Sequence, residues 1–334
     1  MASKEKIILV LSVDTEEEFD WNSGFPQDNC SIDNVNQIPG FQYFCENLGI
    51  RPTYLVDYPV IANHYAADMF RDFVESGNAE VGAHLHPWCN PPFFGDTNEE
   101  RSHVINLPES EVEAKLDCLV EKIVQGVGQS PRSFRTGRWG ISASLINLLE
   151  RKGFAVESSV YPLYSNRFFS CEDAPTQAYY PSPQNALQPS MPREIIELPV
   201  TVGFNRADHD RSKQLYQFIE NSPLSRLRLI GLLWRLGLLR KIYLSPELSS
   251  PEDMLAVAKT TLAQGNPMLH MYFHSSSLLQ GDNPLMFKSA NGCNVFEGVH
   301  QLISWLREDY EIEFCTLSEA ADLVRSRQLN LVAA

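Results

Sequence analysis

The sequence lacks any long apolar run. A membrane-spanning helix needs about 18 or more consecutive apolar residues, and the sequence contains no such uninterrupted stretch. The one apolar run near the start, in MASKEKIILVLSVD, ends in an acid and has no small-residue cleavage site, so it is not typical of a signal peptide. We therefore expect no transmembrane helix and a cytoplasmic location.

Paired cysteines are also missing. The seven cysteines are an odd number and form no CxxC pair, which argues against a disulfide framework and against a zinc–thiolate site. The sequence has no GxSxG, no P-loop and no GxGxxG after its first apolar run. The sequence therefore lacks the signatures of serine hydrolases, nucleotide hydrolases and dinucleotide-binding enzymes.

Positive charge is scarce. Lys and Arg number 27 against 42 Asp and Glu, so the net charge is -15 and the sequence pI is about 5.0. Such a chain repels the phosphates of nucleic acids, and we expect no nucleic-acid partner. With 334 residues, 43% of them hydrophobic, we expect one large domain over residues 1–334 with an insertion at 205–246. The sequence does not indicate an oligomeric state.

Short apolar runs alternate with helical patterns along the chain. The predicted strands are Lys6–Val13, Pro52–Val56, Ala79–Ala83, Ser133–Arg135, Ala155–Ser158, Glu194–Val200, Met268–Phe273 and Glu311–Cys315. The predicted helices are Val60–Glu75, Glu109–Val124, Ser142–Arg151, Pro251–Ala263, Phe296–Arg307 and Ser318–Arg325. This alternation is typical of an α/β protein with parallel strands, and seven or eight such units suit a barrel.

Two segments interrupt the alternation. Phe168–Arg193 is rich in Pro, Ser, Gln and Tyr and is predicted to be a long loop. Residues 205–246 include SRLRLIGLLWRLGLLRKIYL, which places basic residues among Leu, Ile and Trp in an otherwise acidic chain. An amphipathic helix at 226–244 could hold the protein at the inner face of an anionic membrane. The alternative is a lid or an oligomer contact.

Polar side chains gather where the predicted strands end. In a βα barrel the active site lies at the carboxyl ends of the strands. The residues at these ends, from six separate segments, are Asp14, Glu16, Asp57, His84, His86, Arg135, Glu157 and His274. We expect them to meet on one face of the molecule.

The histidines in EVGAHLHPW indicate a metal site. His84 and His86 are two residues apart at a strand end, so their side chains point the same way. The acidic stretch LSVDTEEEFDW offers Asp14 and Glu16 with the same spacing. Imidazole and carboxylate ligands with an open position predict a catalytic divalent ion, Zn²⁺ first, with Co²⁺, Mn²⁺ or Fe²⁺ as alternatives.

The acidic pair could divide its work between two roles. One of Asp14 and Glu16 can bind the metal while the other takes a proton from water, and the sequence does not say which. The remaining carboxylates, Glu17, Glu18 and Asp20, are expected to be solvated or to support the site through hydrogen bonds.

Further candidates come from FRTGRWG and from YFHSSSL. Arg135 could hold a carboxylate of the site in place, and Arg138 could do the same or bind substrate. His274 is a candidate general acid, whereas His270, four residues earlier on the same strand, is expected in the core. We expect the histidines without motif context to be structural or exposed: His64, His103, His209 and His300.

Taken in order, these motifs resemble those of the polysaccharide deacetylase superfamily, also called carbohydrate esterase family 4 or the chitooligosaccharide deacetylase homology domain. SVDTE resembles its acidic motif, EVGAHLHPW its histidine motif, FRTGRWG its arginine motif and YFHSSSL its late histidine motif. The resemblance covers roughly residues 5–320 and is closest to the intracellular WalW-type branch, which opens on a stretch like DTEEEFDW.

The resemblance implies a distorted (β/α)7 barrel and the hydrolysis of an acetyl group from a sugar. Asp14 would take the proton from water and His274 would protonate the leaving amine, while Trp88, Arg138 and Trp139 would bind substrate. The family's acidic pair is usually Asp-Asp or Asp-x-Asp, its arginine motif carries a Pro, and its histidines are four apart. In this sequence Trp88 stands four residues after His84, where the family has its second histidine. Either His86 takes the role of that histidine or the metal is bound in another way.

The implied substrate is an N-acetylated, or O-acetylated, sugar used in surface-glycan biosynthesis. Inside a cell this would be a nucleotide sugar or a lipid-linked precursor. Two alternatives stay open: a hydrolase of non-sugar C–N bonds in amides or ureides on the same fold, and a non-catalytic binding protein with a degraded site.

Overall fold

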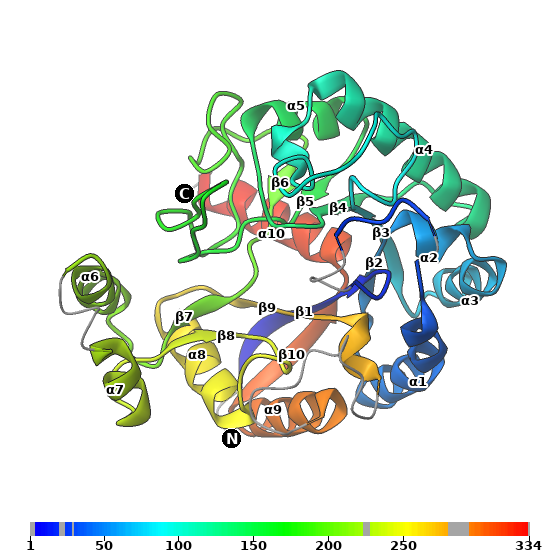
Figure 1. The fold of residues 1–334 in the computed structure, drawn as a ribbon. Helices are drawn as coiled ribbons and strands as arrows, with labels where there is room; N and C mark the ends of the chain where they lie inside the picture. The colour runs from blue at the N-terminus through cyan, green and yellow to red at the C-terminus, as the bar shows by residue number, and fades with distance from the viewer. Residues whose placement is uncertain (1–3, 20–23, 29, 223–227, 280–293, 333–334) are drawn as a thin grey trace.

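A parallel sheet curled into a half-barrel forms the centre of the computed structural model (Figure 1). The structure describes residues 4–19, 24–28, 30–222, 228–279 and 294–332. Eight strands make up the sheet: β1 (Glu5–Thr15), β2 (Thr53–Val56), β3 (Glu80–Leu85), β4 (Ser133–Thr136), β5 (Val156–Glu157), β6 (Ile196–Glu197), β9 (Met268–His274) and β10 (Tyr310–Cys315). The predicted α/β barrel architecture is thus confirmed.

The long first strand organises the sheet. β1 pairs with β10 along Glu5–Val10, with β9 along Ile8–Asp14 and with β2 along Ser12–Thr15. Because the β9 pairing overlaps both others, β10 and β2 share the opposite edge of β1. The sheet continues from β2 through β3, β4 and β5 to β6, always parallel. Beyond β6, the N–H of Thr201 donates to the carbonyl of His270 on β9, which links the two sides of the barrel.

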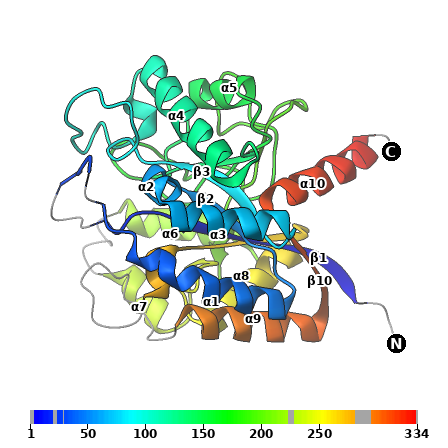
Figure 2. The same ribbon diagram turned by 90° about the vertical axis from the view of Figure 1, so that its right-hand side faces the viewer.

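Helices surround the sheet, as both views show (Figures 1 and 2). They are α1 (Ile38–Leu48), α2 (Tyr58–Ala62), α3 (His64–Glu75), α4 (Glu109–Val127), α5 (Ala143–Arg151), α6 (His209–Glu220), α7 (Leu229–Arg235), α8 (Pro251–Ala263), α9 (Val295–Asp309) and α10 (Leu317–Val332). In the described part of the chain, none of them is both long and apolar enough to cross a membrane.

Capping residues set several of these boundaries. Ser142 accepts a hydrogen bond from the N–H of Leu145 and starts α5, as predicted. The single helix predicted at Val60–Glu75 is wrong, because Asn63 is extended, ends α2 and caps α3 through a bond from the N–H of Ala66. The side chain of Asn63 thus starts a second helix inside the stretch whose apolar spacing predicted a single one.

Other differences from the sequence prediction concern short elements. The strand expected at Glu194–Val200 is only the two residues of β6, since the following Pro199 has no N–H to donate. α1 was not expected. The segment 205–246 contains α6, α7 and β8 (Lys241–Tyr243), which pairs antiparallel with β7 (Val202–Phe204). Phe168–Arg193 contains no named helix or strand, as expected.

Alternate residues of β1 enter two different cores. Leu9 and Leu11 belong to the large cluster between the sheet and the outer helices. Ile8 and Val10 belong to a smaller cluster inside the barrel, which α10 closes with Leu317 and small alanines. Since side chains alternate along a strand, Asp14 has the same parity as Ile8 and Val10 and faces the barrel interior. Figure 2 places the start of β1 and the end of α10 at one end of the molecule, and β1 runs from there toward the other end.

Candidate active site

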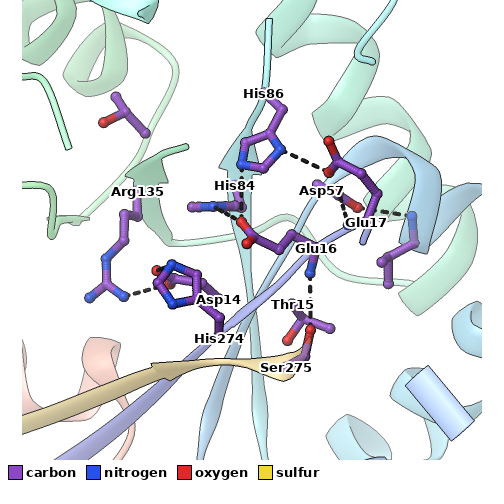
Figure 3. A network of polar contacts seen from close by, with 12 residues as sticks. Asp14, Thr15, Glu16, Glu17, Asp57, His84, His86, Arg135, His274 and Ser275 are labelled. Carbon is purple, nitrogen blue, oxygen red and sulfur yellow. Dashed lines mark hydrogen bonds and ion pairs between the residues drawn. The ribbon is translucent and has the colours of Figure 1, made fainter. Parts of the chain in front are cut away.

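Charged and imidazole side chains meet at the carboxyl ends of four strands. Asp14 lies near the end of β1, His84 on β3, Arg135 on β4 and His274 at the end of β9, and Figure 3 shows them facing one another. His86 follows β3 directly. The prediction that strand-end side chains share one face is confirmed for Asp14, His84, Arg135 and His274, because parallel strands present their carboxyl ends on the same side of the barrel.

A carboxylate and two imidazoles form the group best suited to a metal. Oε2 of Glu16 lies 3.2 Å from Nε2 of His84 and 3.1 Å from Nε2 of His86. The two rings are 4.8 Å apart between centroids, so both reach the same oxygen. Their ligand atoms lie within 4.8 Å of one another, and both imidazoles are buried.

Glu17 supports this group from behind. Its Oε2 lies 2.8 Å from Nδ1 of His86, and its Oε1 accepts a 2.6 Å hydrogen bond from the indole N–H of Trp88. The expected supporting hydrogen bonds are therefore present, but the expected solvation is wrong because Glu17 is 1% exposed. A carboxylate on the far nitrogen of an imidazole fixes its tautomer and orientation, as it does for metal-binding histidines.

Asp57, from the segment after β2, and the remaining acids of LSVDTEEEFDW have separate tasks. The carboxylate of Asp57 at the start of α2 accepts from the N–H of Glu17 at 2.8 Å and from the N–H of Val60. Glu18 accepts from the Ser31 hydroxyl and from the N–H of Asn34, so it ties the following loop to β1. Asp20 lies outside the described residues.

A second set of atoms with metal-binding spacing consists of Glu17, Asp57, His86 and Cys89. Here the carboxylates of Glu17 and Asp57 lie side by side, and burial and the neighbouring Glu17 raise the pKa of Asp57 well above its usual range. Because Glu17 is already bonded to His86 and Trp88, we assign this set to support of the first group.

A glycine makes room for His86. A Cβ placed on Gly137 would lie 1.8 Å from Cδ2 and 2.4 Å from Nε2 of that ring. No larger residue fits there unless the ring or the turn after β4 moves. Gly137, the first glycine of FRTGRWG, is thus required by the packing of His86, which the sequence alone did not indicate.

Asp14, the other member of the acidic pair, forms an ion pair with Arg135. Nη1 of Arg135 donates to Oδ1 of Asp14 at 2.6 Å, and both side chains are buried. Nε of Arg135 donates to the carbonyl of Ser158, and Nη2 donates to the Ser158 hydroxyl and lies 3.4 Å from Nε2 of His270. Among the described residues, neither set with metal-binding spacing includes Asp14, so the arrangement favours Glu16 as the carboxylate ligand. The assignment of Asp14 as a metal ligand stays a prediction.

His274 is held by a carboxylate that the sequence analysis missed. Oε1 of Glu247 lies 2.8 Å from Nδ1 of His274, and the other oxygen accepts from the backbone N–H of His274 and from the hydroxyl of Ser277. This leaves Nε2 of His274 pointing to the site, 3.8 Å from Oδ2 of Asp14. His270, further down β9, is buried as expected and lies 2.9 Å from the hydroxyl of Ser12.

The charged groups of the site shift the pKa values of Glu16 and His274 in opposite directions. Burial would raise the pKa of Glu16, but the charge of His274 and the two imidazole contacts outweigh it and hold the pKa well below its usual range. Burial would lower the pKa of His274, yet the charge of Glu247 and the two other nearby carboxylates raise it to about 10. At neutral pH, His274 is therefore a proton donor opposite an ionised carboxylate.

The donor set fits a divalent metal ion. Nε2 of His86 is buried and makes no hydrogen bond of good geometry with any described residue, although it lies 3.1 Å from Oε2 of Glu16. A buried nitrogen without a hydrogen bond calls for another partner. Two imidazole nitrogens and a carboxylate oxygen are the ligands of catalytic zinc and related ions. Within the described residues, no thiolate belongs to this first set.

A pocket of about 160 Å³ opens beside these groups. It is lined by Glu16, Phe19, His86, Trp88, His103, Gly137, Arg138, Trp139, Tyr164, Asn166, Phe169 and His274. Trp88, Arg138 and Trp139, the predicted substrate-binding residues, thus border the pocket, and their role stays a prediction. Trp88 is buried, stacks on His86 at 4.3 Å and gives its N–H to Glu17, so it forms the back wall.

The same pocket includes a histidine that the sequence gave no reason to select. His103 is buried, and neither of its ring nitrogens has a hydrogen-bond partner among the described residues. Its ring lies 4.3 Å from that of Phe168 between centroids, and burial and the nearby charge of Arg138 lower the pKa of His103 to about 4. A larger cavity of about 270 Å³ lies by the amino ends of β2, β3 and β4, between Arg51, Arg132 and Glu319, far from these groups.

Comparison with known proteins gives a match in structure alone. No protein-family model and no curated protein matches the sequence. A crystal structure described as a candidate polysaccharide deacetylase from Mycobacterium smegmatis is similar, with a TM-score of 0.54 and 13% identity over 98% of this chain and 92% of that one. A candidate glycoside hydrolase/deacetylase from Parabacteroides distasonis has a TM-score of 0.58 and 14% identity over 97% of this chain and 72% of that one. The chain has the fold of these polysaccharide deacetylase-like proteins, a distorted (β/α)7 barrel.

Proposed function

We propose that this protein is a metal-dependent hydrolase that removes an acetyl group from an N-acetylated or O-acetylated sugar. The observation that carries the proposal is the grouping of Glu16, His84 and His86 as a metal-binding set beside a pocket that His274 also lines, with Oδ2 of Asp14 3.8 Å from Nε2 of His274. The motifs of the sequence and the fold of the chain support the same reading.

The three ligands would hold Zn²⁺, Co²⁺, Mn²⁺ or Fe²⁺. A divalent ion bound there would polarise the acyl carbonyl and lower the pKa of a water molecule. Glu17 keeps the ring of His86 oriented through Nδ1, which leaves Nε2 for the ion.

Proton transfer is divided between two side chains. Asp14 accepts the proton from water, and Arg135 fixes the orientation of its carboxylate through a 2.6 Å bond. His274, kept protonated by Glu247, donates from Nε2 to the leaving nitrogen or oxygen. The products are acetate and the deacetylated sugar.

The pocket suits a sugar ring. Its wall combines Trp139, Tyr164 and Phe169 with the amide of Asn166, and aromatic faces with a few polar groups are typical of small-molecule sites. We propose a nucleotide sugar or a lipid-linked glycan precursor as the substrate, with a role in surface-glycan biosynthesis.

The test combines metal content with acetate release. Protein purified without added metal is reloaded with zinc, cobalt or manganese and assayed on N-acetylated and O-acetylated sugars, nucleotide sugars and lipid-linked precursors. We expect one ion per chain and acetate release in wild type, both lost in a His84→Ala/His86→Ala variant. His300→Ala, a matched change at an exposed histidine on α9, should leave both unchanged. A wild type that takes up none of the metals would refute the proposal, and metal-free cleavage of another amide would favour the non-sugar alternative.

A further inference from the structure

Half of the large apolar side chains exposed in the described part of the chain gather on α6, α7 and the turn after α7. They are Leu215 (45% exposed), Phe218 (64%), Leu232 (52%), Trp234 (39%), Leu236 (60%) and Leu238 (44%), which we call the α6–α7 surface. Exposed apolar residues are normal when scattered, but a cluster on two touching helices marks a binding surface.

The opposite side of this unit is packed against the pocket wall. Leu233 and Leu239 enter an apolar cluster with Tyr161, and Trp139 and Tyr164 of the pocket pack on the same cluster. α7 is therefore apolar on both sides, and among the described residues only its inner side is covered. No described residue of 205–246 lines the pocket itself.

The charge around the surface is opposite to that of the whole chain. Residues 205–246 contain eight Lys and Arg against three Asp and Glu, although the chain has a net charge of -15. Residues 228–240 contain three arginines and no acid. Arg228 and Arg235 are exposed, while Arg240 bonds Asp253 at 2.7 Å and lies over the ring of Trp234.

We propose that the α6–α7 surface docks on an anionic lipid bilayer. Leucine and phenylalanine side chains enter the acyl boundary, Trp234 suits the headgroup level, and Arg228 and Arg235 meet lipid phosphates. A second copy of the chain fits less well, because a symmetric contact through α7 would bring Arg228 and Arg235 toward their own copies, and residues 228–240 contain no acid to pair with them. In Figure 2, α7 lies at the end of the molecule away from the start of β1.

Vesicle sedimentation of the purified chain tests this docking. We compare phosphatidylcholine vesicles with vesicles that contain about one third phosphatidylglycerol, at low and at physiological salt. Binding is expected only to the anionic vesicles, and it should weaken as salt screens the arginines. Leu236→Glu/Leu238→Glu should bind at least tenfold more weakly, and Arg235→Gln about fivefold, since one basic residue near such a surface contributes about 1 kcal/mol.

Two controls make each outcome decisive. Tyr43→Glu/Tyr65→Glu changes two equally exposed apolar residues on α1 and α3 and should bind like wild type. Circular dichroism and metal content check that each variant is folded, and they do not depend on the α6–α7 surface. The proposal is overturned if wild type ignores anionic vesicles or if the Leu236→Glu/Leu238→Glu variant binds them equally. It is also overturned if light scattering shows a dimer in solution that this variant dissociates.

Discussion

The tight packing of Gly137 against His86 gives a quantitative prediction about the metal site. In Gly137→Ala the new Cβ would lie 1.8 Å from Cδ2 of the ring, whereas real Cβ contacts essentially never fall below 3.0 Å. The ring or the turn must therefore move by roughly 1 Å or more, which exceeds the roughly 0.2 Å over which metal–ligand distances vary. We expect metal affinity to fall by at least about 100-fold, the upper end of what loss of an orienting partner costs.

The assay is competition for zinc or cobalt against a chelating dye, with thermal unfolding of the metal-free protein beside it. Gly140→Ala is the matched control, because the three atoms nearest to its Cβ would all belong to the Ile105 side chain, at 3.0–3.4 Å. That side chain can adjust, so the affinity of Gly140→Ala should stay within a few-fold of wild type. A folded Gly137→Ala protein that binds the ion as wild type does would show that His86 is not a ligand.

Three further changes separate the roles of the neighbouring acids. Asp14→Asn leaves the guanidinium of Arg135 buried without its charge partner, so we expect unfolding free energy to drop by about 3–5 kcal/mol and acetate release to be lost, while one ion per chain remains by mass spectrometry. Glu17→Gln should keep the fold and weaken metal binding about 10–100-fold in the dye competition, and unchanged affinity would contradict its orienting role. The raised pKa of His274 stabilises the metal-free fold below about pH 6.5, and this stability is lost as pH rises toward 10; in melting curves, His274→Gln should lack that decline.

Much of the fold was predictable because the strand and helix patterns are local. The βα alternation, the boundaries of α8 and the cap at Ser142 all follow from nearby residues. The split between α2 and α3 was not predictable by periodicity, because Asn63 interrupts the helix without interrupting the apolar pattern. β7 and β8 were missed because their pairing joins segments far apart in the sequence.

The residues of the site that lie at strand ends were predictable, but the side chains that orient them through hydrogen bonds were not. Asp14, His84 and Arg135 stand out because they follow apolar runs in short motifs. Glu247 lies in SPELSS, which has no motif, and it reaches His274 only because the segment after β8 runs beside the end of β9. Spacing in the sequence reports residues on one strand, whereas the hydrogen bonds that orient them come from other elements.

The succession of acids after β1 follows from the alternation of side chains. Asp14 and Glu16 have the same parity and face the barrel, where one meets Arg135 and the other meets the two imidazoles. Glu17 has the opposite parity, so its carboxylate passes behind His86 and holds the ring by its other nitrogen. One short stretch can in this way supply a base, a metal ligand and the support of a second ligand. Moving any of these carboxylates by one position would send it to the wrong side of the imidazoles, which explains why the negative charge is concentrated where a buried strand ends.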